Sequence, residues 1–265
     1  MKEYKKVLSI AGSDSGGGAG IQADIKTISA LGCFATTAIT AITAQNTMGV
    51  TDVMKIPAYI IGEQIEAILT DIGADAVKIG MLHDSETMIC VKNILIRNNV
   101  KNIILDPVMI STSGHNLMQP DAIQTLKNEL LEIATIITPN IPEAEALLGT
   151  EINTIKKMHE ASRKLSEKFN TSVLVKGGHM EDEKLTDILY DKMTSEISDF
   201  SFSRIITPNT HGTGCTLSSA IASYVALGEN LQDAVRKACY YVHKAIESGA
   251  SYKIGKGHGP VNHFF

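Results

Sequence analysis

The chain has 265 residues, 44% of them hydrophobic and 20% charged, which suffices for one large globular domain with a sizeable core. Its formal net charge is −5 without a block of like charge, which argues against a nucleic-acid partner. The sequence shows neither a membrane span nor a signal peptide, and its 4 cysteines lie too far apart for a disulfide framework or a zinc site, so we expect a cytoplasmic protein.

Strands and helices alternate in the predicted first half of the chain. A buried strand over 7–11 runs into the glycine-rich loop 12–20, and a helix with apolar spacing follows over 21–31. This loop lacks the spacing of the dinucleotide fingerprint and the lysine of a P-loop, so alone it does not predict a nucleotide site. The alternation continues with a strand over 36–44, a helix over 58–72, a strand over 76–79, a helix over 85–97 and a strand over 102–105.

The second half keeps this order up to an antiparallel edge. Predicted there are a helix over 121–133, a strand over 135–137, a helix from Pro142 with Asn140 as its cap, a helix over 154–169 and a strand over 172–175. Residues 185–206 predict two or three short strands without intervening helices, typical of an antiparallel edge. Helices over 216–227 and 231–248 follow. Without a repeat or a linker, we expect a single α/β domain over residues 1–265.

Polar side chains recur where the predicted strands end. They are Gln45, Asp106, Asn140, Glu143 and Lys176. The carboxyl ends of parallel strands share one edge of a sheet, where ligands bind in open α/β folds. We therefore expect these side chains, far apart in the sequence, to converge on one crevice.

The turn from Gly212 to Cys215 lies directly before a predicted helix. The first backbone N–H groups of a helix have no partner inside it and the helix dipole is positive there, so a glycine turn at this point makes an anion site. The same field favours the thiolate of Cys215. Two plainer interpretations stay open: a turn that binds nothing, and a cysteine that only packs.

Carboxylates, an amide, a lysine and an anion-binding turn are the groups that phosphoryl transfer needs. Asp106, Asn140 and Glu143 offer oxygen ligands, which suit Mg²⁺ better than zinc. Lys176 offers positive charge to phosphates, and the N–H groups of the turn would hold the transferred group. A basic side chain would take the proton of the accepting hydroxyl.

With these residues in place, the chain resembles the hydroxymethylpyrimidine/phosphomethylpyrimidine kinase family of thiamine synthesis, within the ribokinase-like superfamily. The resemblance spans nearly the whole chain. It rests on motifs that follow one another in order: residues 11–24 (AGSDSGGGAGIQAD), 106–109 (DPVM), 138–143 (TPNIPE), 175–179 (VKGGH) and 211–216 (HGTGCT). It implies a three-layer α/β/α sandwich with a mostly parallel central sheet and a short antiparallel edge.

The resemblance implies a kinase that acts twice. MgATP would phosphorylate the primary alcohol of 4-amino-5-hydroxymethyl-2-methylpyrimidine, and then its monophosphate to the diphosphate. Cys215 would be the base where the superfamily usually has an aspartate. The second acceptor is already ionised and would need no strong base. Relatives are commonly dimers, so a homodimer is expected, with ATP and the pyrimidine as its small-molecule partners.

The resemblance also assigns residues to roles. Catalysis would involve Cys215, Gly212, Gly214 and Lys176. The nucleotide phosphates would be bound by Asp106, Asn140, Lys176 and Thr213, and Mg²⁺ by Glu143, Asn140 and Asp106, partly through water. The pyrimidine pocket would be lined by Gly12, Asp24, Gln45, Met81 and Val108. Residues 111–118 would form a flap that excludes water.

Three alternatives stay open. A pyridoxal kinase shares the scaffold, but some such enzymes carry a second cysteine after Asp-Pro-Val-Met, where this chain has Ile110-Ser111-Thr112-Ser113. A thiol enzyme acting through Cys215 would need no ATP and would leave Asn140, Glu143 and Lys176 unexplained. A non-catalytic regulator would bind a nucleotide or a vitamin without turnover, and the sequence shows no regulatory module for it.

Overall fold

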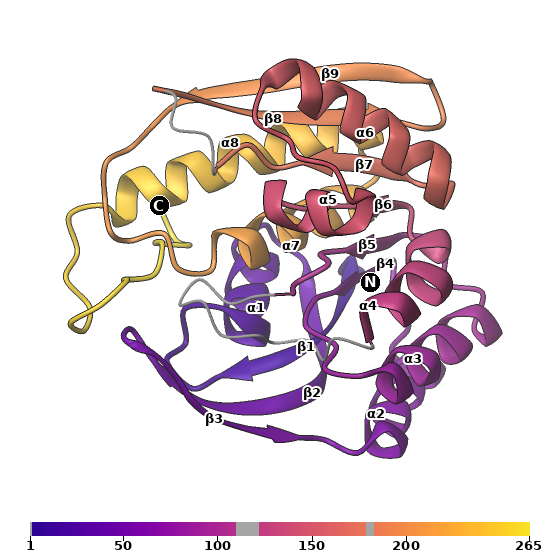
Figure 1. Cartoon of the computed structure of the whole chain (residues 1–265). Helices are drawn as coiled ribbons and strands as arrows, with labels where there is room; N and C mark the ends of the chain where they lie inside the picture. Colours follow the sequence, from indigo (N-terminus) through magenta and orange to yellow (C-terminus); the bar gives the residue numbers. More distant parts are fainter. Residues whose placement is uncertain (1, 110–121, 179–182) are drawn as a thin grey trace.

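A nine-stranded sheet forms the centre of the computed structural model, which describes residues 2–109, 122–178 and 183–265 (Figure 1). The strands are β1 (Lys6–Asp14), β2 (Phe34–Asn46), β3 (Gly49–Lys55), β4 (Ala76–Ile79), β5 (Ile103–Leu105), β6 (Ile136–Ile137), β7 (Ser172–Val175), β8 (Lys184–Asp191) and β9 (Glu196–Ser203). They lie side by side in the order β3-β2-β1-β4-β5-β6-β7-β8-β9.

The central strands run parallel, and both edges of the sheet are antiparallel. β2, β1, β4, β5, β6 and β7 pair in parallel, whereas β3 pairs antiparallel with β2, and β8 and β9 extend the other edge antiparallel. The predicted mostly parallel sheet with an antiparallel edge over 185–206 is confirmed. The sequence does not predict β3, because Val50 is its only buried side chain and its apolar alternation is weak.

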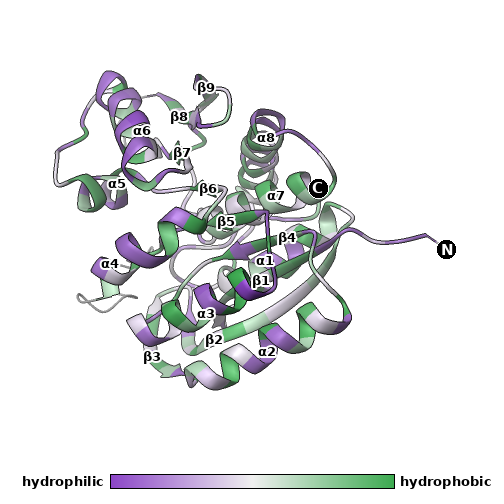
Figure 2. Cartoon of the chain, turned by 90° about the vertical axis from the view of Figure 1, so that its right-hand side faces the viewer, coloured by the Kyte–Doolittle hydropathy of each residue, from purple (hydrophilic) through white to green (hydrophobic). Residues whose placement is uncertain are grey.

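Helices cover both faces of the sheet and complete three layers (Figure 1, Figure 2). One core cluster draws on α2 (Ala58–Asp71), α3 (Ser85–Arg97), α5 (Ile141–Leu148) and α6 (Ile155–Phe169), and the other on α1 (Gly20–Ala30), α7 (Thr213–Ala226) and α8 (Leu231–Gly249). Leu8 belongs to the first cluster and Val7 to the second, because successive strand side chains point to opposite faces. Within the described residues, no helix combines the length and the apolar character that a membrane span needs.

The helix predicted over 121–133 is irregular. It divides into α4 (Ala122–Thr125), a π-helical turn (Leu126–Leu130) and a 3₁₀ turn (Leu131–Ile133), and residue 121 lies outside the described part. Leu126 and Leu131 are both buried although they are five positions apart. A regular α-helix would turn them to different faces, whereas the wider π turn brings them to the same core.

Candidate active site

Side chains from neighbouring strand ends meet beside α7. Asp106 follows β5, Asn140 and Glu143 follow β6, and Lys176 follows β7. Lys176 Nζ lies 2.7 Å from Asp106 Oδ1 and 4.0 Å from Glu143 Oε2. The expected convergence is therefore present for Asp106, Asn140, Glu143 and Lys176, whereas Gln45 contacts His211.

Burial shapes the electrostatics of this charged cluster of Asp106, Glu143 and Lys176. Both carboxylates are buried, and Lys176 is their cation. Burial raises the pKa of Glu143 to about 7, with Lys176 opposing the shift and Asp106 adding to it. Burial also works to lower the pKa of Lys176, but the two carboxylates hold that pKa above its ordinary value. Lys176 therefore carries a positive charge at neutral pH, as phosphate binding requires.

Asn140 and Glu143 form a capping box at the start of α5. The Glu143 N–H donates to the Asn140 side-chain oxygen (2.9 Å), and the Asn140 N–H donates to the Glu143 carboxylate (2.8 Å). Pro142 lies in the first turn, as predicted. A backbone bridge pairs Asn140 with Lys176. The cap thus holds the Glu143 carboxylate at a fixed place beside the lysine.

The glycine turn at the start of α7 packs against this charged cluster. Gly212 is the N-cap residue and has a left-handed backbone, with φ of 83°. A Cβ on Gly212 would lie 1.8 Å from the Gly18 carbonyl oxygen, so only glycine fits here. A Cβ on Gly214 would lie 3.3 Å from Asp106 Oδ2 and 3.5 Å from Lys176 Nζ. The positive end of α7 and the Lys176 ammonium are therefore neighbours, which favours an anion between them.

Gly212→Ala is expected to reduce the free energy of unfolding by about 1–3 kcal/mol or more, because alanine is strained in the left-handed region and its Cβ would meet Gly18. Gly228→Ala is the matched control: φ of Gly228 is also positive (97°), but no atom lies within 4 Å of an added Cβ. Urea unfolding of the two variants measures the difference. Equal losses would show that the contact with Gly18 is unimportant.

Cys215 and Thr213 lie in the first turn of α7, and both are partly buried. Burial raises the pKa of the Cys215 thiol to about 11, although Lys78 acts to lower it; Asp24 and Asp106 add to the rise. Removal from water thus opposes the ionisation that the helix N-terminus is predicted to favour. At neutral pH Cys215 is a thiol.

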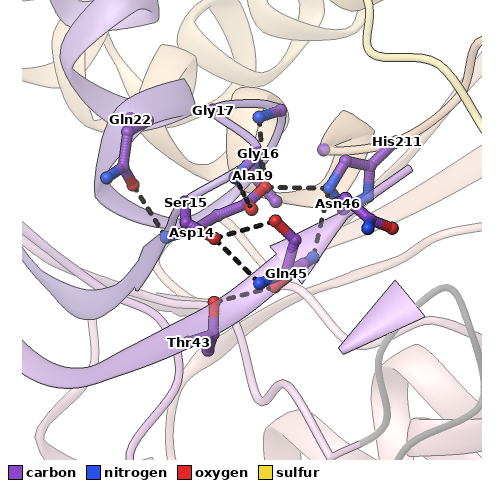
Figure 3. A network of polar contacts seen from close by, with 12 residues as sticks. Asp14, Ser15, Gly16, Gly17, Ala19, Gln22, Thr43, Gln45, Asn46 and His211 are labelled. Carbon is purple, nitrogen blue, oxygen red and sulfur yellow. Dashed lines mark hydrogen bonds and ion pairs between the residues drawn. The ribbon is translucent and has the colours of Figure 1, made fainter. Parts of the chain in front are cut away.

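Asp14, the last residue of β1, holds the glycine-rich loop in place (Figure 3). Its Oδ1 accepts a hydrogen bond from the Gly16 N–H (2.7 Å), and its Oδ2 accepts from the N–H groups of Gly18 (3.1 Å) and Ala19 (2.8 Å). Burial disfavours the charge of Asp14, but hydrogen bonds from His211 and the backbone hold its pKa below the ordinary value. The loop before α1 is thus ordered around an ionised carboxylate.

His211 lies between this loop and Gln45 at the carboxyl end of β2 (Figure 3). His211 Nε2 lies 3.0 Å from Asp14 Oδ2 and 3.3 Å from Gln45 Nε2. Because an ionised carboxylate only accepts hydrogen bonds, His211 Nε2 donates to Asp14. This hydrogen bond ties the turn before α7 to the glycine-rich loop, close to Gln45, which is predicted to bind the substrate.

The other residues predicted to line the pyrimidine pocket lie at the same end of the sheet. Gly12 and Met81 are adjacent, since a Cβ on Gly12 would lie 3.2 Å from Met81 Sδ. Val108 and Asp106 are among the residues that line a small hollow next to β4 and β5. Gln45 and Val108 are partly exposed, as ligand contacts require. The predicted flap over 111–118 lies outside the described residues, as does His179.

Asp24, the remaining residue predicted to line the pyrimidine pocket, lies in a buried polar cluster. Its side chain is fully buried, and its carboxylate already binds Lys78 Nζ and the hydroxyl groups of Ser9 and Ser219. Both carboxylate oxygens of Asp24 therefore have protein partners. Helical position alone does not reveal this, because the partners come from β1, β4 and α7.

In the sequence analysis Lys78 is overlooked and Asp14 is given no role, although the sequence around each residue indicates a buried side chain with a polar partner. Lys78 is a charged residue inside the otherwise apolar strand 76–79, where lysine is rarely buried without a partner. Asp14 stands at the junction of a strand and a glycine-rich loop, where a carboxylate readily accepts backbone hydrogen bonds. Both side chains are buried in the structure, where Lys78 forms an ion pair with Asp24 and Asp14 accepts hydrogen bonds from the backbone and His211.

The oxygen donors fit Mg²⁺ bound together with a phosphate-bearing substrate. Across the described ranges, no cluster of three or more His, Cys, Asp and Glu side chains is placed to hold a metal ion alone. Asp106 and Glu143 supply two buried carboxylates close to Lys176. Mg²⁺ commonly takes one or two carboxylates and fills its other positions with water and phosphate oxygens. The Asn140 side-chain oxygen already accepts the hydrogen bond of the helix cap, so Asn140 would contact Mg²⁺ through a bound water.

Comparisons of the sequence agree on one family. A family model described as phosphomethylpyrimidine kinase matches residues 14–262. The hydroxymethylpyrimidine/phosphomethylpyrimidine kinase of Rhizobium meliloti is 46% identical over 258 residues, covering 97% of this chain and 96% of that protein. The thiamine biosynthesis bifunctional protein of Geobacter sulfurreducens is 44% identical over 257 residues, and the chain spans 52% of its length.

Solved structures show the same fold with two substrate types. The crystal structure of phosphomethylpyrimidine kinase from Clostridium difficile 630 has a TM-score of 0.81 and 44% identity, covering 91% of this chain and 99% of that one. The Bacillus subtilis pyridoxal kinase in complex with ADP has a TM-score of 0.90 and 34% identity, covering 98% of each chain. The scaffold is therefore common to both kinds of kinase.

Proposed function

This chain belongs to the phosphomethylpyrimidine kinase family, and from this premise we propose its reaction. The enzyme transfers the γ-phosphoryl group of ATP to the hydroxymethyl group of 4-amino-5-hydroxymethyl-2-methylpyrimidine, and then phosphorylates the monophosphate to the diphosphate. The observation that carries the proposal is the contact of the first turn of α7 with Lys176 and Asp106. An anion-binding turn, a charged lysine and carboxylates for a metal are the parts of a phosphoryl-transfer site.

Each transfer needs positive charge at the phosphates and an acceptor oxygen in line with them. Lys176 supplies charge from the end of β7, and backbone N–H groups of the turn at the start of α7, that of Gly214 among them, supply dipoles. Cys215 takes the proton of the hydroxymethyl group in the first transfer. The second acceptor is a phosphate whose second pKa is about 6, so it is already ionised at neutral pH and needs no base.

Mg²⁺ would be held by Asp106 and Glu143, with Asn140 acting through water. When bound with ATP, the ion supplies positive charge at the phosphate oxygens. The carboxylates are at present paired with Lys176, which Asp106 contacts at 2.7 Å. With Mg²⁺ and ATP bound, Lys176 would pair with phosphate oxygens and the carboxylates with the ion, so that each charge would keep a partner.

Lys176→Ala is expected to lower kcat/KM for ATP by about 10²–10³-fold, because one preorganised cation at the phosphates is lost and Asp106 loses its partner. Lys184→Ala, at an exposed lysine of β8, is the matched control and should keep its kinetics. Steady-state rates at varied ATP concentration measure both variants. Unchanged kinetics in the Lys176 variant would remove this lysine from the phosphate site.

A pyridoxal kinase of the same fold is the second candidate, because the solved pyridoxal kinases match this chain at a TM-score of 0.90. Two observations favour the pyrimidine. Relatives described as pyrimidine kinases are more similar in sequence, at 46% against 34% identity. The segment after Asp-Pro-Val-Met also has no cysteine at Ile110-Ser111-Thr112-Ser113.

A competition experiment tests the proposal. The pyrimidine alcohol and pyridoxal are offered together at equal concentration with MgATP, and the phosphorylated products are separated and identified by mass. We expect pyrimidine monophosphate and then diphosphate to predominate. A predominance of pyridoxal phosphate would favour the second candidate, and the absence of any phosphorylated product would end both proposals.

Three further expectations belong to this proposal. The single sheet of nine strands supports one kinase domain over residues 1–265. A homodimer is expected from the resemblance, and light scattering of the purified protein measures its mass in solution. A cytoplasmic location agrees with the free state of Cys33, Cys90, Cys215 and Cys239.

A further inference from the structure

A fully buried ion pair lies between β4 and α1. Lys78 Nζ contacts both carboxylate oxygens of Asp24, at 2.9 Å and 2.8 Å, and neither side chain is exposed. The Ser9 hydroxyl donates to Asp24 Oδ2 (2.6 Å), and the Ser219 hydroxyl donates to Asp24 Oδ1 (2.8 Å). Every strong hydrogen-bonding position of the carboxylate therefore has a partner. The proposed reaction gives this pair no role.

The pair lies below the first turn of α7. Ser219, which binds Asp24, is four residues after Cys215, so both side chains are on the same face of that helix. At the end of β4, a Cβ on Gly80 would lie 2.8 Å from Lys78 Nζ. The backbone that leads from β4 to Met81 thus passes close to the ammonium group.

Four charged groups act on the Cys215 thiol, each from a different element. They are Asp24 on α1, Lys78 on β4, Asp106 after β5 and Lys176 after β7. Lys78 favours the thiolate, whereas Asp24 and Asp106 oppose it. Burial works to lower the pKa of Lys78, but Asp24 holds it above the ordinary value, so the ammonium stays charged. A buried ion pair alone is weak evidence of stability, since apolar residues often serve as well.

We propose that Lys78 is a positioning residue that sets the ionisation of Cys215 in the transfer to the alcohol, with Asp24 as its counter-ion. This inference rests on the proposed function, in which Cys215 is the base. In that transfer the Cys215 thiolate takes the hydroxymethyl proton, and the alcohol oxygen forms a bond to the γ-phosphorus of ATP. The bond from that phosphorus to the bridging oxygen breaks, ADP leaves with its electron pair, and the thiol returns the proton to water.

The two partners of the pair act on the thiolate in opposite directions. Lys78→Met leaves the negative charge of Asp24 without its counter-ion, so Cys215 should ionise at higher pH. Asp24→Asn leaves the positive charge, so Cys215 should ionise at lower pH. The double variant removes both charges and should resemble the wild type. If the ion pair had only a structural role, the two single variants would not shift the pKa of Cys215 in opposite directions.

The test measures the rate at which iodoacetamide labels Cys215 in the protein without ATP, from pH 7 to 10, by mass analysis of the peptide that carries it. A shift of one pKa unit changes the rate about tenfold below the pKa, because only the thiolate reacts. We expect labelling about tenfold slower in Lys78→Met and about tenfold faster in Asp24→Asn. Cys90, partly buried elsewhere, is labelled in the same sample and serves as the internal control.

Equal labelling profiles of Cys215 in the wild type and both single variants would overturn the proposal. If a single variant does not fold, Ser219→Ala takes its place, because it removes one hydrogen bond to Asp24 and keeps the ion pair. The less shielded carboxylate should then slow the labelling of Cys215. An unchanged rate in Ser219→Ala would contradict the proposal in the same way.

The labelling needs neither ATP nor turnover, so its outcome is separate from that of the proposed function. Opposite shifts without any phosphorylation of the pyrimidine would support the ion pair and end the kinase proposal. Phosphorylation of the pyrimidine with unchanged labelling of Cys215 in the variants would support the kinase proposal and overturn the role of the ion pair. Where both hold, Lys78→Met should lower the rate of the first transfer and move its pH profile upward, and leave the second transfer nearly unchanged.

Discussion

Cys215→Ala is expected to slow the phosphorylation of the pyrimidine alcohol by about 10²–10⁴-fold, the range that a positioned base contributes. The phosphorylation of the monophosphate should fall by much less. Its acceptor is ionised at neutral pH, so no proton has to be removed during that transfer. The substitution leaves the backbone of the α7 turn in place, and ATP binding should therefore persist. Rates with each pyrimidine substrate, measured separately at saturating MgATP, give the two effects.

Cys90→Ala is the matched control for this experiment. Cys90 is also a partly buried cysteine on a helix, but its thiol contacts the Ala58 carbonyl on the far side of β2 and β4 from α7. Its variant should keep both rates. Equal loss of the two transfers in Cys215→Ala would mean that the side chain supports the shape of the site and does not act as a base.

A rise of about tenfold per pH unit between pH 7 and 9 is expected for the first transfer, because the pKa of the Cys215 thiol is about 11. The sign follows from the base: a higher pH increases the thiolate fraction, which is only about one in ten thousand at pH 7. The second transfer should stay nearly flat over the same range, since its acceptor has lost its proton by pH 7. The ratio of the two rates should therefore grow about a hundredfold.

The ratio of the rates is the quantity to measure, on one enzyme preparation supplied with either substrate. The pKa of Glu143 is raised by burial to about 7, so this carboxyl changes its charge in the same range. The change of charge at Glu143 affects the rates of both transfers, so it cancels in the ratio of the first rate to the second. A ratio independent of pH would show that the thiolate of Cys215 takes no proton in the rate-limiting step.

The local pattern of the sequence predicts most of the elements. The helix expected over 85–97 is α3 (Ser85–Arg97), because its apolar spacing coincides with Asp84, which caps the helix through the Thr87 N–H. β3 is missed for the opposite reason. It has one buried residue and owes its existence to hydrogen bonds with β2, which a local pattern does not contain.

The charged cluster of Asp106, Glu143 and Lys176 is predictable because it follows from topology. Parallel strands bring their carboxyl ends to one edge, so residues that follow successive strands meet there whatever their separation in sequence. The capping box of Asn140 is likewise local, since its two partners are three residues apart. In these cases the backbone alone carries the side chains to one place.

The ionisation of Cys215 and the burial of Asp24 are beyond local reasoning because both depend on packing. The N-terminus of α7 favours a thiolate, but the degree of burial decides the result and is set by elements distant in sequence. Asp24 lies on α1 and looks like a solvated helical charge until β4 supplies Lys78 and α7 supplies Ser219. A lysine inside an apolar strand was the one sequence signal of a buried partner.

The most direct test of the central claim is a time course of the wild-type enzyme with MgATP and the pyrimidine alcohol as the only acceptor. The site around Lys176 and Cys215 predicts that the monophosphate appears first, reaches a maximum and then converts to the diphosphate, with one ADP formed for each phosphoryl group transferred. Formation of ADP without a phosphorylated pyrimidine, or no reaction at all, would contradict the account.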